Sequence, residues 1–170
     1  MAIREIRLFG DPVLTTRSSE VTTFDSSLDR LVEDMLETMD DAGGVGLAAN
    51  QIGLTKRIFV FDCTGIESGL RGHIINPVWE PLDDTVQIGS EGCLSIPDIS
   101  MDTERYDNVV VRGQDSRGRN ISIQASGLLA RCIQHETDHL DGVLFLKRLD
   151  PQSRKEAMGI IRAADWFKEN

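Results

Sequence analysis

The stretch 131-RCIQHETDHLDG-142 holds two of the chain's three histidines, four residues apart, with a glutamate directly after the first. Residues four apart lie on one face of an α-helix, about 6 Å from each other, so His135 and His139 can bind one cation. Around the helix axis, Glu136 lies about 100° from His135 and about 60° from His139, which places its carboxylate beside a bound water and outside the line of ligands. The pattern predicts a metal site with its own proton acceptor.

The helix that carries these histidines is expected to be buried, because it also carries Leu128, Leu129, Ile133 and Leu140. Buried imidazoles and carboxylates need partners, since unpaired polar groups are costly to remove from water. A shared metal ion provides such a partner. Histidines satisfied inside a core without metal are the alternative.

A catalytic metal site needs a third protein ligand, and the residues alone leave its identity open. The metzincin pattern would place a histidine at Phe145, which cannot bind a metal. Glu156 is a downstream acid without a surrounding motif. Cys93 lies in 89-GSEGCLSIP-97, where glycine and proline indicate an irregular edge at which a thiol can face a cavity. A Cys-His-His set would favour Zn²⁺ or Fe²⁺ over Ca²⁺ or Mg²⁺.

The other cysteines and the third histidine are interpreted as structural. Cys132 shares the histidine face, but its Cα would lie about 10 Å from that of His139 along one helix, so it is expected to line a pocket or the core. Cys63 ends an apolar run and is expected in the core. His73 lies in an apolar strand and is expected to be satisfied locally or exposed.

Residues 26–44 give the strongest periodic signal, because apolar side chains recur there every three or four residues. Ser26 and Asp29 resemble a capping box at the start of this helix, and Gly43 is expected to end it. The opening residues 1–14 alternate between apolar and polar, as in a strand.

Short β-branched runs between turn residues predict strands over 57–62, 73–79, 108–113 and 120–125. Further helices are expected over 126–141 and from Pro151, after an N-cap at Asp150, to about Phe167. Strands flanked by helices without regular βαβ alternation indicate an α+β fold. The length of 170 residues fits a single domain, 1–170.

The composition excludes several classes of protein. A formal net charge of −10 argues against a broad nucleic-acid-binding surface, which requires lysine and arginine. No stretch approaches the ~20 apolar residues that span a bilayer, and the first residues do not resemble a signal peptide. Three cysteines are an odd number for a disulfide framework. A cytoplasmic protein is expected.

The glycine-rich run 43-GGVGLAANQIG-53 imitates a dinucleotide-binding fingerprint, but it follows a predicted helix where the fingerprint must follow a strand. Glycine also lets the backbone approach a substrate closely. Gln51 then offers a side-chain N–H that can stabilise an oxyanion. A helix cap and turn is the simpler interpretation, and it accounts for Gly43 but not for the whole run.

Three segments together resemble the peptide deformylase family: GVGLAANQ (44–51), EGCLS (91–95) and QHETDH (134–139). The opening IRLFGDPVL (6–14) and the final predicted helix are also similar to that family, so the resemblance covers nearly the whole chain. It implies an α+β fold with antiparallel strands around a central metal-binding helix.

The resemblance also implies the chemistry of the site. Cys93, His135 and His139 would bind one divalent metal ion, with Fe²⁺ expected in the cell and Zn²⁺, Ni²⁺ or Co²⁺ as substitutes. Glu136 would be the acid and base. Gln51 and the Leu94 backbone N–H would stabilise the oxyanion. The implied reaction removes the formyl group from N-formylmethionine on newly synthesised polypeptides and releases formate.

The substrate would contact positions that match the family's. Val45, Gly46 and Gly92 would offer their backbone to an extended peptide. The methionine side chain would be surrounded by Val45, Leu128 and Cys132. Separately, Glu91 is expected to pair with Arg105 and brace the loop that carries Cys93. The residues 98–101 depart from the common family pattern at the substrate entrance, so side-chain preference beyond methionine stays open.

Two rival functions remain at this stage. A general H-E-x-x-H metallopeptidase or amidase would use the same residues, and a metal-binding protein without enzymatic activity would use the same ligands. Glu136 argues against the second, because a structural site needs no proton acceptor.

The final helix is a candidate contact for the ribosome, where formylated chains emerge. From Pro151 to Asn170 the charged side chains give a local net charge of +1: Arg154, Lys155, Arg162 and Lys168 against Glu156, Asp165 and Glu169. A helix that only packs on the core is the simpler alternative.

Overall fold

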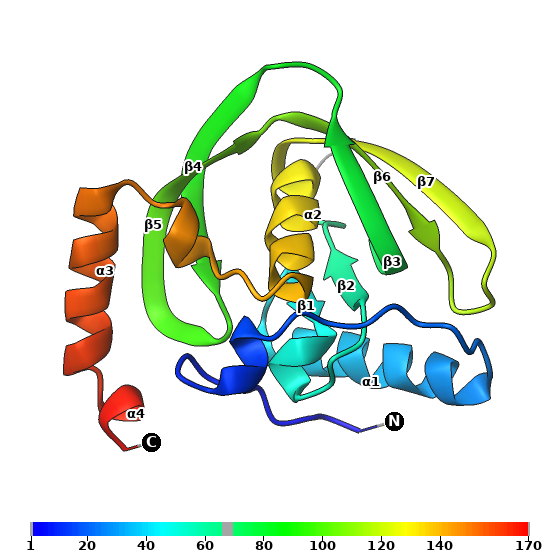
Figure 1. Ribbon diagram of the computed structural model, residues 1–170, viewed down its shortest axis with the longest axis horizontal. Helices are drawn as coiled ribbons and strands as arrows, with labels where there is room; N and C mark the ends of the chain where they lie inside the picture. The colour runs from blue at the N-terminus through cyan, green and yellow to red at the C-terminus, as the bar shows by residue number, and fades with distance from the viewer. Residues whose placement is uncertain (1, 66–69, 170) are drawn as a thin grey trace.

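A computed structural model describes residues 2–65 and 70–169, which form two antiparallel sheets and four α-helices within these ranges (Figure 1). The helices are α1 (Ser26–Ala42), α2 (Gly127–Leu140), α3 (Pro151–Ala163) and α4 (Asp165–Lys168). The strands are β1 (Gly46–Ala48), β2 (Ile58–Asp62), β3 (Arg71–Pro81), β4 (Val86–Cys93), β5 (Ile96–Tyr106), β6 (Asn108–Gln114) and β7 (Asn120–Ser126). The α+β class is confirmed.

Both sheets pack around α2, which Figure 1 shows at the centre of the molecule. The larger sheet has the strand order β1-β2-β3-β6-β7, and the smaller one consists of β4 and β5 alone. Every residue from Leu129 to Leu140 is buried, which confirms the prediction of a buried helix. A helix buried to this extent is expected to hold most of its polar side chains in specific contacts, so those without a partner are of interest.

The first long helix, α1, was predicted with one error at its start. Asp25 is the N-cap, and its side chain accepts a hydrogen bond from the Ser27 N–H at 3.0 Å. The expected capping box of Ser26 and Asp29 is therefore wrong, because the preceding aspartate already fills the cap. Gly43 ends the helix at φ 70°, as expected for a left-handed cap.

The opening segment is not a strand, contrary to expectation. Its backbone hydrogen bonds go to α1 and to loops: Ala2 N–H donates to Asp34 Oδ1 at 2.7 Å, and Arg4 N–H donates to Thr38 Oγ1 at 2.9 Å. Further on, Arg7 N–H donates to the Gln51 carbonyl oxygen at 2.7 Å. The alternating apolar residues therefore do not mark a strand: Ile6 packs on the cluster that includes α1, Phe9 packs on the cluster that includes α3, and Ile3 is exposed.

The last predicted helix is two helices. The backbone of Ala164 is extended, with φ −75° and ψ 136°, so α3 ends there and α4 turns away. The turn brings Phe167 to Phe9, with ring centroids 5.9 Å apart. Asp150 is the N-cap and Pro151 the first residue of α3, as predicted. Among the described helices, none has the length and apolarity needed to cross a membrane.

Candidate metal centre

Cys93 is the last residue of β4, at a break in the pairing with β5. Cys93 pairs with Ile96, but the preceding Gly92 pairs with Ser100, so the ladder shifts between Gly92 and Cys93. The shift turns the end of the strand toward α2, where the thiol is partly buried. The predicted irregular edge is confirmed.

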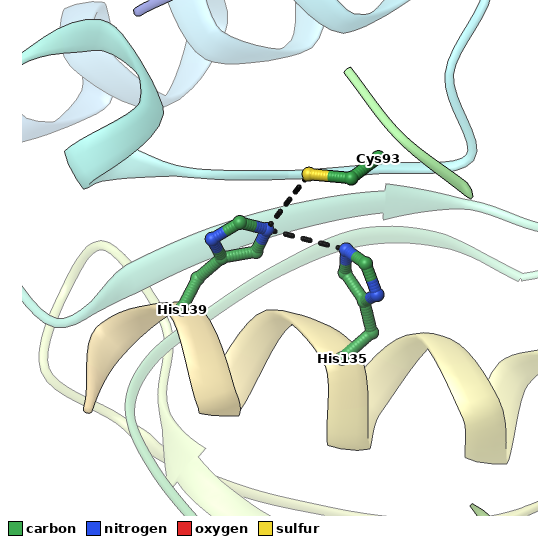
Figure 2. Close-up of side chains that lie close together, drawn as sticks. All are labelled: Cys93, His135 and His139. Carbon is green, nitrogen blue, oxygen red and sulfur yellow. Dashed lines mark hydrogen bonds between the residues drawn. The ribbon is translucent and has the colours of Figure 1, made fainter. Parts of the chain in front are cut away.

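The two histidines of α2 meet this thiol (Figure 2). Cys93 Sγ lies 3.3 Å from His139 Nε2, and His139 Nε2 lies 3.2 Å from His135 Nε2. All three ligand atoms are within 4.8 Å of one another. Among the described residues, no other group of three or more His, Cys, Asp or Glu side chains is arranged so that it could bind a metal ion.

The donor set fits a divalent metal ion. One thiolate and two imidazoles are ligands for Zn²⁺ or Fe²⁺. Burial lowers the pKa of His139, which keeps its imidazole in the neutral form that binds metal. The other candidate for the third ligand, Glu156, is exposed on α3 and accepts a hydrogen bond from Gln152 at 3.4 Å. Cys93 is therefore the third ligand.

Glu91 orients the ring of His135. Its carboxylate accepts a hydrogen bond from His135 Nδ1, so Nε2 faces Cys93 and His139. Arg105 donates to both oxygens of Glu91, at 2.6 and 3.1 Å, which confirms the expected pair. Burial opposes the charge of Glu91, but the hydrogen bonds from His135 and Arg105 hold its pKa well below the usual value.

Glu136 lies beside the ligands without joining them. Its Oε1 is 3.9 Å from His135 Nε2, and within the described residues its Oε2 has no hydrogen-bond partner. Burial raises the pKa of Glu136 to about 7. Gly46 packs against it so closely that a Cβ there would lie 2.7 Å from Oε1 and 2.8 Å from Cys132 Sγ.

Gln51 belongs to a short 3-10 helix over Ala49–Ile52, and its side chain also approaches the Cys93 thiol. Its Oε1 accepts the Ala48 N–H at 2.9 Å, which fixes the amide so that Nε2 points to Ser95 Oγ at 3.1 Å and Cys93 Sγ at 3.7 Å. Leu94 follows Cys93 in the turn between β4 and β5.

These groups open onto one cavity of about 380 Å³. All five residues predicted to bind substrate lie along its wall: Val45, Gly46, Gly92, Leu128 and Cys132. Gln51, Leu94 and Glu136 line it too, as do two of the metal ligands, Cys93 and His135. His139 is fully buried, and Asn50 donates to its carbonyl oxygen at 2.6 Å.

The other predicted structural residues are placed as expected. Cys63 is buried in the apolar core. His73 accepts the Ser116 N–H at 3.0 Å.

Sequence reasoning missed Arg131, which lines the cavity and donates to Glu91 Oε2 at 2.7 Å. Its position four residues before His135 was a usable signal, because it places the side chain on the histidine face of α2.

A buried Cys-His-His metal site with a glutamate at the wall of an open cavity defines a metal-dependent hydrolase. Comparison with known proteins specifies which one. The family model described as polypeptide deformylase matches residues 3–155. The chain therefore belongs to the peptide deformylase family.

Individual relatives agree. The chain is 64% identical to peptide deformylase 1 of Corynebacterium efficiens over 169 residues, covering 99% of this chain and 100% of the relative. It is 65% identical to peptide deformylase 1 of Corynebacterium glutamicum, with the same coverage. A peptide deformylase crystal structure from Legionella pneumophila superposes with a TM-score of 0.87 at 40% identity, covering 99% of this chain and 96% of that chain.

Proposed function

We propose that this deformylase cleaves the formyl group from N-formylmethionine at the start of newly synthesised polypeptides, leaving formate and a free amino group. The observation that supports this most is the convergence of Cys93, His135 and His139 with Glu136 beside one cavity. The three ligands would hold one divalent cation, and a cation so bound supplies a nucleophile from water at neutral pH and polarises a carbonyl oxygen. Fe²⁺ is the metal we propose for the cell, with Zn²⁺, Ni²⁺ or Co²⁺ as substitutes.

Glu136 is the proposed proton carrier. Its Oε2 has no partner within the described residues, so it can accept a proton from the attacking water. The same oxygen then gives that proton to the nitrogen of the departing amine, while the C–N bond of the formamide breaks. No net proton stays on the enzyme after the cycle.

Gln51 and the backbone N–H of Leu94 are the proposed donors to the oxyanion. Because the Ala48 N–H holds Gln51 Oε1, the amide presents Nε2 to the side of the site where Cys93 lies. A preorganised donor of this kind typically contributes about 10²–10³ in rate.

The residues that line the cavity fit a substrate with a methionine side chain and an extended backbone. Leu128, Cys132 and Val45 would surround the methionine side chain, with Gly46 and Gly92 against the peptide backbone. The Val45 carbonyl oxygen accepts the Asp62 N–H at 2.9 Å, so the N–H is the backbone group of Val45 that we propose for the substrate contact. Asp98 and Ser100 also line the cavity, and they come from the segment that departs from the family pattern.

Formate release tests the function. Formyl-Met-Ala-Ser, acetyl-Met-Ala-Ser and a peptide with blocked ends are offered to the protein under oxygen-free conditions, with metal analysis of the same sample. We expect cleavage of the formyl peptide only. Preference for the acetyl group or an internal bond would indicate a general metallopeptidase or amidase, and bound metal without formate release would indicate a metal-binding protein.

We also propose that the C-terminal helices contact the ribosome in the cytoplasm. Lys155, Arg162 and Lys168 are exposed there; Arg154 is exposed too, but it donates to the Leu146 carbonyl oxygen at 3.0 Å. Reversing two exposed charges (K155E with R162E) should reduce co-sedimentation with ribosomes and leave formate release from a tripeptide unchanged. Unchanged co-sedimentation would contradict the contact.

A further inference from the structure

Glu91 connects the strand that carries the thiol to the helix that carries the imidazoles. It lies on β4, two residues before Cys93, and is buried against α2. Its Oε1 accepts from His135 Nδ1, and its Oε2 accepts from Arg131 Nη1 at 2.7 Å. Because Arg131 and His135 lie one helical turn apart, the carboxylate is attached to α2 at two points along the helix axis.

Arg131 makes further contacts with both strands of the smaller sheet. Its Nη1 also donates to the Thr103 carbonyl oxygen of β5 at 2.9 Å, and its Nη2 donates to Gln87 Oε1 of β4 at 3.2 Å. The Gln87 amide returns to α2 by donating to the Gly127 carbonyl oxygen at 2.8 Å. A Cβ on Gly89 would lie 3.3 Å from Nη2, so glycine leaves room for the guanidinium.

These contacts matter because, in the part of the chain that the structure describes, no strand of the smaller sheet pairs with a strand of the larger one. Besides its short connections to the larger sheet, β4 is held against α2 by side-chain contacts, and its position decides where Cys93 lies relative to the histidines. Arg105 also holds Glu91, but it belongs to β5 in the same small sheet and reaches α2 through Asp138, at 2.8 Å. Arg131 comes from α2 itself.

We propose that Arg131 is a positioning residue of the metal centre. By holding Glu91 Oε2 it fixes the carboxylate that orients His135. By the same bond it sets the end of β4, and with it the Cys93 thiol, against the two imidazoles. Arg131 acts through Glu91, and the proposal concerns metal binding alone, so it stands apart from the choice of substrate.

The test uses Co²⁺ as the probe. Arg131→Met keeps a long apolar side chain and removes the donors. Arg112→Met is the matched control, because Arg112 pairs with Glu80 on the surface of the larger sheet at 3.0 Å. Both variants and the unaltered protein are loaded with Co²⁺, and their absorption spectra are recorded. Transfer of the metal to a chelator is then measured at equilibrium, which gives the affinity, and over time, which gives the release rate.

For Arg131→Met we expect metal affinity to fall about 10–100-fold, as for other partners that orient metal ligands. The thiolate-to-cobalt absorption should shift as well. Arg112→Met should match the unaltered protein in both measurements. An unchanged spectrum and release rate in Arg131→Met would overturn the proposal.

A second variant covers the case in which Arg131→Met does not fold, which circular dichroism of the metal-free protein reports. Arg131→Lys keeps the charge but lacks the fork that reaches Glu91, Thr103 and Gln87 together. It should release Co²⁺ faster than the unaltered protein, and an equal rate would overturn the proposal. These measurements contain no substrate, so they test the role of Arg131 in metal binding alone. They can be interpreted even if the formate assay contradicts the proposed function.

Discussion

At the scale of single residues, Glu136 is the proposed proton carrier, and its substitution allows proton transfer to be tested separately from metal binding. It lies beside His135 but is not a ligand, so Glu136→Gln should leave the metal content unchanged. Glutamine has nearly the same shape and cannot carry the proton, so formate release should fall by about 10²–10⁴. Metal analysis and formate release on the same sample check this. Loss of activity together with loss of metal would contradict the assigned role.

Gly46 is a second residue whose substitution has a definite expectation. A Cβ at this position would collide with Glu136 Oε1 and Cys132 Sγ, both within 3.0 Å. Gly46→Ala should therefore displace the carboxylate, and a shift of about 1 Å near the reacting atoms can cost about 10² in rate. Gly159→Ala, on α3, meets no atom within 4 Å and is the control. Equal activity of the two variants would contradict the expectation.

The residue-level predictions from sequence were good where the information was local. His135, Glu136 and His139 lie within five residues on one helix, so helical geometry alone placed them. Cys93 lies 46 residues from His139, and no periodicity predicts such a contact. Its assignment as a ligand rested on the family resemblance. The contact of Arg131 with Glu91 was missed because these residues, too, lie far apart along the chain.

At the scale of elements, two substitutions at the start of α1 distinguish the observed N-cap, Asp25, from the expected one, Ser26. Asp25 accepts the Ser27 N–H, whereas Ser26 is the first helical residue. Asp25→Ala should lower the free energy of unfolding, because it removes the side chain that caps the helix. Ser26→Ala should change it by less than about 0.5 kcal/mol, as for an ordinary surface position. Urea denaturation of both variants checks this. A larger effect of Ser26→Ala than of Asp25→Ala would support the capping box that was expected from the sequence.

The attachment of the opening segment to α1 should depend on pH. The hydrogen bond from Arg4 lowers the pKa of Asp34. A carboxyl group whose pKa is lowered by folding stabilises the protein above its ordinary pKa, and this contribution is lost as the pH falls through the lower folded value.

Asp34→Asn should therefore cost about 1 kcal/mol at pH 7. The cost should shrink below about pH 4, where the carboxyl group of the unfolded chain is protonated. Glu33→Gln, at an exposed neighbouring position, is the control and should have no such effect. If Asp34→Asn lowers the free energy of unfolding by the same amount at pH 7 and below pH 4, the role of the charge is contradicted.

The elements show which patterns predict structure. The long helices α1 and α2 were predicted because many apolar residues repeat with one period. The strands β4 and β5 were missed, since they pair only with each other and mix glycine, acids and apolar residues. The opening segment alternates like a strand, but its donors found partners on α1, which no local pattern indicates.

At the scale of the whole molecule, a ligand that binds the folded state alone must stabilise it. With free metal at about 100 times its dissociation constant, the gain is about 2.7 kcal/mol. Thermal denaturation with and without Zn²⁺ measures it. Cys93→Ala should remove most of this increment, whereas Cys63→Ala, in the core, should retain it whatever its own effect on stability. An increment that survives in Cys93→Ala would contradict the thiol as a ligand.

The separation of Cys93 from the histidines along the chain also orders events during synthesis. Cys93 is translated 42 residues before His135 (135 − 93) and 46 residues before His139. A polypeptide that ends before α2 contains the residues that pair β4 with β5, but it lacks both imidazoles that lie beside the thiol in the folded protein. The complete set of three ligands, and metal binding that depends on it, can therefore form only after α2 has been synthesised.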